Sequence, residues 1–432
     1  MKKIIVSAAL AAMALSTTAS ALEDIKVNGQ AKLFYETDNK GTDRNAFSKD
    51  SASGEVAMTL GMTGKQGNVS FEGEFSYGTT MGLEDNVVSG VRTNAVQEGV
   101  YVSKANFTVP LVASTALKMG RQELNTPLAF TEKWNSLQNN FDAAVLVNSS
   151  LPNTTIIGAF VGQTNTANAM TWKAGSEFEQ MHGGAYALAA LYNDKTIAVN
   201  AWYYHIMDAG RSNTGGVEVT NSAGDANVTV PTANSGLGLG AAGVGSVNAV
   251  WVDAGVTMGG ANVKAYVSQI APSDSAIESS LGYALSADFK AGDWTVSAAA
   301  SMIDEDSVLP IGNVATGFKK TKLPTAGVYT DGLYVAQAGS TAIKVKAAGK
   351  IGSTGLALQV INNTNSGADG QPMGLLAYQA QTLETTEADL IITEKLGDIN
   401  LKAIVMHRMF ADDATDTSTG GQYIRVVAGV NF

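Results

Sequence analysis

The 432-residue chain lacks cysteine and contains few charged residues. Without cysteine, a disulfide framework is excluded. Charged residues make up 16% of the chain, whereas soluble domains average about 25%. Basic clusters that would indicate nucleic-acid binding are absent from the sequence. After residue 21 there is no run of about 18 strongly apolar residues. The sequence therefore predicts no membrane-spanning helix.

The first 21 residues have the pattern of a secretory signal peptide. Lys2 and Lys3 form a basic start, residues 4–15 form a short apolar run, and Ala19 and Ala21 flank a small-residue cleavage site. We expect cleavage after residue 21, and an uncleaved membrane anchor is the alternative. Removal of both lysines would change the net charge from −11 to −13.

The remaining chain shows short segments in which apolar and polar residues alternate, separated by Gly, Asn, Asp and Ser. Side chains of a strand alternate with period two, and such segments are typical of transmembrane barrels. We predict an all-β, antiparallel up-and-down barrel over residues 22–432, with about 18 strands and 16 as the alternative. The predicted strands are residues 25–36, 54–63, 68–78, 99–109, 114–123, 141–148, 154–162, 183–192, 195–206, 244–257, 262–270, 281–290, 293–303, 341–349, 355–362, 385–395, 399–409 and 422–432.

The connections between these segments alternate between short turns and long loops, such as residues 207–243 and 304–340. This alternation predicts short periplasmic turns and long extracellular loops. All eight prolines fall in turns, in loops or at strand edges. Proline cannot donate to a strand ladder, so this placement supports the assignment.

The last segment, residues 422–432, places apolar side chains at every second position and ends on Phe432. It resembles the closing strand of an outer-membrane β-barrel. That resemblance implies recognition of the Phe432 strand by the barrel-assembly machinery. Sixteen to eighteen strands enclose an aqueous lumen. The sequence therefore predicts a pore.

Residues 117–162, which contain the run Gly120-Arg121-Gln122-Glu123-Leu124, resemble the OprD-like porins and, more closely, the major outer membrane porins of Campylobacter and its relatives. The resemblance implies a homotrimer in the outer membrane of a Gram-negative bacterium, in contact with lipid and lipopolysaccharide. It also implies that the third long loop, about residues 124–140, folds inward as a constriction.

Charged side chains at a constriction set the selectivity of a channel. The candidates near the inward loop and on the wall of the lumen are Glu123, Glu132, Lys133, Asp142, Lys104, Lys118, Arg121, Arg408 and Arg425. Further wall candidates are Lys264, Lys344, Lys346, Lys402, Glu36, Glu55, Glu72, Glu74, Asp288 and Asp389. Arg121 shares parity with Leu117 and Met119, so it needs a bulge or a place beyond the hydrocarbon. The alternative for the loop charges is that they face water in the vestibule.

Aromatic residues near strand ends are expected to form belts at the membrane interfaces. They are Tyr35, Tyr77, Trp202, Tyr203, Tyr204 and Tyr423, while Phe130 and Trp134 would anchor the inward loop to the wall. No motif indicates an enzyme or a cofactor. The acidic residues 304–306 and 412–413 could hold a Ca²⁺ ion, although solvated loop acids are the commoner explanation.

We predict a general diffusion porin for small hydrophilic solutes. The net charge of −13 suggests a preference for cations. One alternative is an OprD-like channel in which a basic ladder guides small carboxylates or peptides. A surface adhesin and a soluble β-rich enzyme are further alternatives.

Overall fold

The computed structural model describes residues 22–39, 45–83, 99–165, 178–209, 217–220, 227–230, 245–273, 278–305, 309–366, 383–412 and 417–432. The predicted signal peptide, residues 1–21, lies outside the described residues. In the described part of the chain, no helix has both the length and the apolar character needed to cross a membrane.

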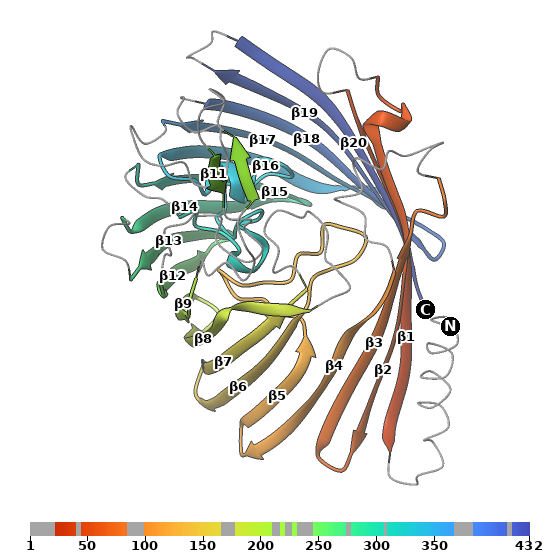
Figure 1. Ribbon diagram of the computed structural model, residues 1–432, viewed down its shortest axis with the longest axis vertical. Coiled ribbons are helices and arrows are strands. Elements are labelled where there is room, and N and C mark those ends of the chain that lie inside the picture. The colour runs from red at the N-terminus through yellow and green to blue at the C-terminus, as the bar shows by residue number, and fades with distance from the viewer. Residues whose placement is uncertain are drawn as a thin grey trace.

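Eighteen strands form one closed antiparallel sheet, in which β1 pairs with both β2 and β20. They are β1 (Glu23–Asp38), β2 (Ala52–Gln66), β3 (Val69–Thr79), β4 (Gly99–Val112), β5 (Thr115–Gln122), β6 (Phe141–Leu151), β7 (Thr154–Thr164), β8 (Glu179–Asn193), β9 (Ile197–Ile206), β12 (Val247–Met258), β13 (Ala261–Pro272), β14 (Ser280–Ala291), β15 (Trp294–Ile303), β16 (Ser340–Ile351), β17 (Thr354–Asn365), β18 (Leu383–Leu396), β19 (Ile399–Asp412) and β20 (Thr417–Asn431). Figure 1 shows the strands surrounding a common interior.

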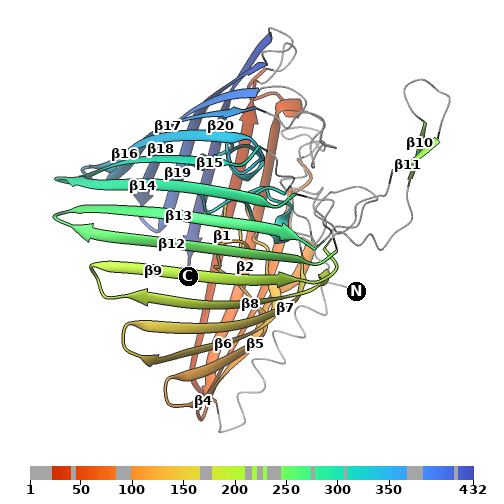
Figure 2. The same cartoon turned by 90° about the vertical axis from the view of Figure 1, so that its left-hand side faces the viewer.

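The eighteen-strand prediction is confirmed, and every predicted segment overlaps one strand of the barrel. The largest displacements are at the starts of β8 and β20, which begin at Glu179 and Thr417. Two short strands, β10 (Val217–Thr220) and β11 (Asn227–Val230), pair within a long connection that the sequence left without strands. Figure 2 shows this hairpin apart from the barrel wall, at the end where the long connections gather.

The short turns gather at the opposite end of the barrel (Figure 2). Two of them contain Gly292 and Gly397, which have φ angles of 62° and 60°. Tight hairpin turns need positive φ, a conformation that glycine adopts without steric cost. The glycines noted between segments of the sequence therefore permit the sharp reversals between strands.

The pairing of β1 with β20 closes the barrel, and Phe432 extends it by one residue pair. Phe432 N donates to Gly29 O at 3.0 Å, and Gly29 N donates to Phe432 O at 2.7 Å. The Phe432 ring lies so close to Gly29 that a Cβ atom there would clash with it. The terminal ring is thus packed against the first strand. Its recognition by the assembly machinery stays a prediction.

The outer face of the strands is apolar, as the alternating pattern predicts. Leu33, Ile343 and Leu358 are each about half exposed, between 47% and 56%, because none of the described residues covers them fully. Their neighbours Phe34 and Lys344 lie on the inner face, and Phe34 is fully buried. A lipid-facing band of this kind is what an outer-membrane barrel requires.

The inner face is not polar all round, which corrects the expectation of a uniformly water-lined interior. Trp202, Trp251, Ile270 and Ile303 belong to one buried apolar cluster on the inner wall. The residues that cover this wall come from two long connections, within residues 123–140 and 309–339, which enter the barrel (Figure 1). Apolar inner positions are stable there because the connections exclude water from them.

This packing also corrects part of the predicted aromatic belt. Trp202 and Tyr204 stack on the inner face with ring centres 5.9 Å apart, and Tyr423 is buried against Tyr329 at 5.0 Å. Tyr203 and Tyr77 point outward and are each 45% exposed, as residues of a belt would be. Some aromatic residues near strand ends therefore point into the barrel, and others point outward.

We predict that a charge destabilises the barrel more on the outer face of β17 than on its inner face. Leu358→Arg places a cation on the lipid-facing side and is expected to lower the free energy of unfolding by about 2–4 kcal/mol. Ala357→Arg places the same charge on the inner face and is expected to cost less than about 1 kcal/mol. Denaturant titration of protein folded into lipid vesicles measures both values. A larger loss for Ala357→Arg would contradict the assigned faces.

Candidate channel constriction and lumen wall

The connection between β5 and β6, residues 123–140, forms the first insert into the barrel. Its start is a compact turn in which Thr126 Oγ1 donates to Ala129 O at 2.7 Å and Leu124 N donates to Thr131 Oγ1 at 3.1 Å. Leu128, Ala129 and Phe130 are buried. The insert therefore presents an apolar face to the wall rather than a loop to water.

The far part of the first insert is tied to strands β1, β2 and β4. Lys32 Nζ donates to Asn135 O at 3.3 Å, Tyr101 Oη donates to Gln138 O at 3.1 Å, and the Ser136 hydroxyl donates to Glu55. These contacts hold residues 135–138 against the inner side of strands β1, β2 and β4.

The connection between β15 and β16 contributes a second insert, residues 309–339, which the sequence analysis treated as an ordinary extracellular loop. It contains two short helices, η4 (Val314–Thr316) and α2 (Gly332–Val335). Its apolar side chains are buried, namely Leu309, Ile311, Val314, Phe318 and Leu323. These five apolar residues in a predicted loop could have indicated from the sequence that the segment packs inside the barrel.

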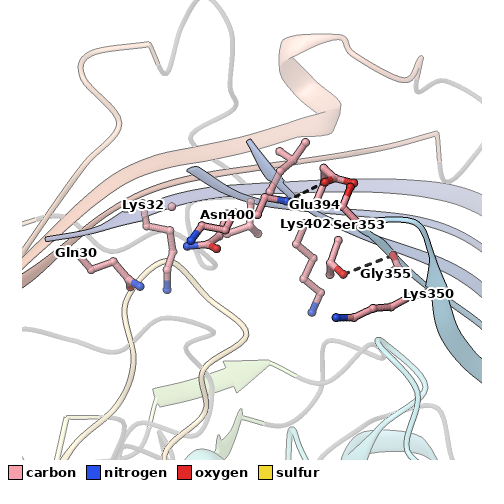
Figure 3. A pocket seen from close by; sticks show the side chains of 13 residues that line it. Gln30, Lys32, Lys350, Ser353, Gly355, Glu394, Asn400 and Lys402 are labelled. Atoms are coloured by element: carbon pink, nitrogen blue, oxygen red, sulfur yellow. Dashed lines mark hydrogen bonds between the residues drawn. The ribbon is translucent and has the colours of Figure 1, made fainter. Parts of the chain in front are cut away.

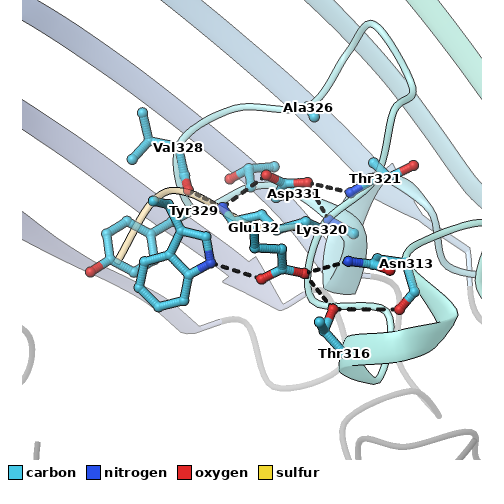
Figure 4. Close-up of polar contacts among 12 residues, drawn as sticks. Glu132, Asn313, Thr316, Lys320, Thr321, Ala326, Val328, Tyr329 and Asp331 are labelled. Atoms are coloured by element: carbon cyan, nitrogen blue, oxygen red, sulfur yellow. Dashed lines mark hydrogen bonds and ion pairs between the residues drawn. The ribbon is translucent and has the colours of Figure 1, made fainter. Parts of the chain in front are cut away.

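Glu132 joins the two inserts instead of lining the pore, which corrects its predicted exposure at the constriction. It accepts hydrogen bonds from Asn313 Nδ2 at 3.0 Å, from Trp134 Nε1 at 2.8 Å and from the Thr316 hydroxyl. Its exposed fraction is 9%. Asn313 Nδ2 also donates to Phe130 O at 2.8 Å. Figure 4 shows Glu132 between the two segments.

Glu387 on β18 anchors the second insert to the wall. Its carboxylate accepts hydrogen bonds from the backbone N–H groups of Val328 and Thr330 at 2.7 Å and of Tyr329 at 3.2 Å. Arg408 Nε lies 3.9 Å from the same carboxylate. Glu387 is fully buried, so these donors replace the water that the charge has lost.

Arg408 and Arg425, both predicted to line the lumen, do lie on the inner face, but the second insert covers them. The Arg408 guanidinium lies 4.0 Å from the ring centre of Tyr334. Arg425 Nε donates to Glu36 Oε2 at 2.6 Å, and the Tyr329 hydroxyl donates to the same carboxylate. Each arginine is at most 5% exposed. Neither offers a free charge to a passing solute.

The charges on β3, β4 and β5 neutralise one another. Lys104 Nζ lies 3.0–3.3 Å from the carboxylates of Glu72, Glu74 and Glu123, and Lys133 Nζ lies 2.5 Å from Glu123. Lys118 pairs with Glu72 at 3.3 Å. This side of the lumen thus combines three lysines with three glutamates.

Glu123 remains ionised within this cluster. Burial raises the pKa of its carboxyl group, but hydrogen bonds from Lys133 and Gln138 and the charge of Lys104 outweigh burial and hold the pKa at about 2. Glu123 therefore keeps its negative charge beside Lys104 and Lys133 at any physiological pH.

Arg121 and Asp142, both candidates for the lumen wall, form a pair of their own. They are cross-strand partners on β5 and β6, and the Arg121 guanidinium lies 3.2 Å from the ring centre of Phe178, which packs against Tyr101 and Leu137. Two hydrogen bonds of 2.8 and 2.9 Å join their side chains, and Arg121 also donates to Val102 O. Arg121 thus lies at the long-loop end of β5 with its charge paired.

Lysines without a carboxylate partner gather on the inner face of β16, β19 and β1. Lys346, Lys350 and Lys402 have no carboxylate oxygen within 4.0 Å among the described residues. Lys32, Lys350 and Lys402 line an open cavity of about 410 Å³ near the short-turn end, into which their side chains point (Figure 3). The sequence analysis did not list Lys350, because the predicted strand ended one residue before it.

The structure does not bring ligands together for a metal ion in the part of the chain that it describes, where three or more His, Asp or Glu side chains nowhere cluster suitably. Asp306 and Asp413, which belong to the two acidic runs, lie outside the described residues. The Ca²⁺ alternative therefore stays untested.

Comparison with known proteins identifies the fold. Neither a protein family model nor a curated protein matches the sequence. Among solved structures, OccD3 (OpdP) of Pseudomonas aeruginosa has a TM-score of 0.65 at 11% identity, over 96% of this chain and 92% of that one. OpdK of the same species, solved with vanillate, has a TM-score of 0.62 at 11% identity, over 96% and 100%. A BenF-like porin from Pseudomonas fluorescens Pf-5 has a TM-score of 0.62 at 12% identity, over the same shares.

These neighbours are outer-membrane porins, and the chain shares their barrel fold. Identities near 11% show the fold alone. The closer resemblance to Campylobacter porins stays a prediction.

We predict that Glu387→Gln loosens the second insert, because a neutral amide accepts weaker hydrogen bonds than a carboxylate. A loss of about 2 kcal/mol corresponds to at least tenfold faster hydrogen exchange of the backbone amides of residues 328–330. The control is Glu384→Gln, because Glu384 is an exposed acid on the same strand. Unchanged exchange in Glu387→Gln would show that the carboxylate does not hold the insert.

Proposed function

We propose that the protein is an outer-membrane channel selective for small carboxylates, which pass along the lysines of β16, β19 and β1. This proposal takes up the OprD-like alternative of the sequence analysis in place of general cation-preferring diffusion. The observation that carries it is the contrast between the two sides of the lumen. The charges of β3–β5 are paired, while Lys346, Lys350 and Lys402 have no carboxylate partner among the described residues.

The unpaired lysines are important for ion selectivity because the selectivity of a channel depends on the charges close to the passing ion. Charged side chains lining a pore select ions at close range, whereas the net charge of a whole protein acts mainly on long-range attraction. The value of −13 includes acids that are already neutralised, such as Glu72 and Glu123. The net charge is therefore a weaker guide to the ion selectivity of the channel than the lysines on its wall.

The two inserts would add selectivity by narrowing the path. They fill one side of the barrel with apolar packing and cover Arg408 and Arg425. A solute would then travel beside the lysine wall, and Lys133 (with a 63% exposed side chain) and Lys32 would lie at the narrow part. One similar barrel, OpdK, was solved with the carboxylate vanillate, which supports carboxylates as the solute class.

We also propose a cellular location and an assembly for the channel. Export through the signal peptide of residues 1–21, insertion into the Gram-negative outer membrane through the Phe432 strand, and assembly as a homotrimer beside lipopolysaccharide all belong to this proposal. The apolar outer face supports residence in a membrane. Passive passage needs neither a catalytic group nor a cofactor.

Single-channel recording in a salt gradient tests the proposed selectivity. We expect a reversal potential that favours chloride over potassium, and micromolar to millimolar benzoate is expected to reduce the chloride current by competing for the same wall. The double variant Lys350→Gln/Lys402→Gln should lower the permeability ratio by roughly two- to fivefold, since neighbouring unit charges interact in water by about 1 kcal/mol at 4 Å.

Lys264→Gln is the matched control, because Lys264 also lies on the inner face but on β13, away from the lysine wall. It should leave the ratio nearly unchanged. A wild-type channel that favours potassium, or equal effects of both variants, would refute the assignment of the wall and restore the general porin as the better reading.

A further inference from the structure

A second cavity of about 250 Å³ lies between the first insert and the inner wall of β6–β9. Its wall is mostly apolar and buried, with Leu124, Leu128, Val161, Trp202 and Ile206 each at most 9% exposed. The cavity exists because the strands opposite the aromatic residues carry small side chains, namely Ala159, Ala185, Ala187 and Ala249.

The polar residues of this cavity mark its mouth. Lys118, Glu123 and Asn125 line it and remain partly or fully exposed, whereas the apolar lining is buried. The cavity therefore opens toward the lumen on the side of the neutralised β3–β5 charges, away from the lysine wall. A charged solute gains nothing by leaving the lysines for this apolar space.

One polar group lies deep in the cavity without a hydrogen bond of normal geometry to the described residues. Tyr204 is 3% exposed, and its hydroxyl has no partner of normal geometry among the described residues, although the Thr126 side chain and the Leu128 backbone are near. A buried hydroxyl without a partner costs about 1–3 kcal/mol. A bound molecule that supplies a hydrogen-bonding atom would recover part of that cost.

We infer that this cavity is a binding site for a small neutral aromatic molecule with one hydroxyl group, such as a simple phenol. A dry apolar cavity of about 150 Å³ accommodates benzene, so 250 Å³ accommodates a monocyclic ring with a substituent. The ring packs beside Trp202 and the alanines, and its hydroxyl pairs with Tyr204. The site lies behind the first insert and is independent of the proposed carboxylate path.

Fluorine NMR of the purified, detergent-solubilised full chain tests this site with two probes, 4-fluorophenol and fluorobenzene. We expect both probes to bind, and 4-fluorophenol to bind more tightly, at roughly millimolar dissociation constants or below. Tyr204→Phe should weaken binding of 4-fluorophenol by about three- to tenfold and leave fluorobenzene unchanged. Tyr266→Phe is the matched control, because it removes an inner-face hydroxyl outside the cavity.

Ala187→Phe distinguishes the cavity from the detergent, because Ala187 pairs with both Ala159 and Tyr204 and a ring there fills the space between them. It should abolish the protein-bound resonance of both probes. Undiminished binding in Ala187→Phe, equal effects of Tyr204→Phe on the two probes, or an effect of Tyr266→Phe as large as that of Tyr204→Phe would overturn the inference. If Ala187→Phe does not fold, the comparison of the two tyrosine variants decides alone.

Discussion

The interior of this barrel depends on two buried carboxylates, Glu387 and Glu36, which hold the second insert against the wall. Glu387 binds three consecutive backbone N–H groups of the insert, and Glu36 binds Arg425 and the Tyr329 hydroxyl. Such charges are stable in a dry interior only when every lost water is replaced by a donor. The hydrogen bonds that satisfy these carboxylates therefore fix the position of residues 328–330. The position of this segment in turn decides which cationic side chains remain accessible to solutes.

This arrangement divides the interior into two unlike halves. On the side of β6–β15 both inserts pack against aromatic and aliphatic wall residues such as Trp202 and Trp251, and water is excluded. On the side of β16–β20 and β1 the lysines keep their solvent contact near the short turns. The path through this wide barrel is thus asymmetric, because the inserts cover the apolar half of the wall and the two buried arginines.

The sequence predicted the barrel well because strand formation is a local property. Period-two alternation, turn glycines and the positions of the prolines each depend on neighbouring residues, so all eighteen strands could be found. Pairing of charges depends on residues far apart in the chain. Glu132 meets Asn313, and Arg425 meets Glu36, across separations that no spacing rule covers. The apolar residues from Leu309 to Phe318 would have indicated the second insert.

The central claim is that solutes pass beside the lysine wall while the opposite half stays dry. Because the chain has no cysteine, a single introduced thiol can report on each side. Single-channel recording of Lys346→Cys, Lys402→Cys and Ala249→Cys during exposure to a negatively charged, water-soluble methanethiosulfonate tests it directly. The account predicts a stepwise change of conductance for Lys346→Cys and Lys402→Cys and none for Ala249→Cys. Reaction at position 249, or silence at positions 346 and 402, would contradict it.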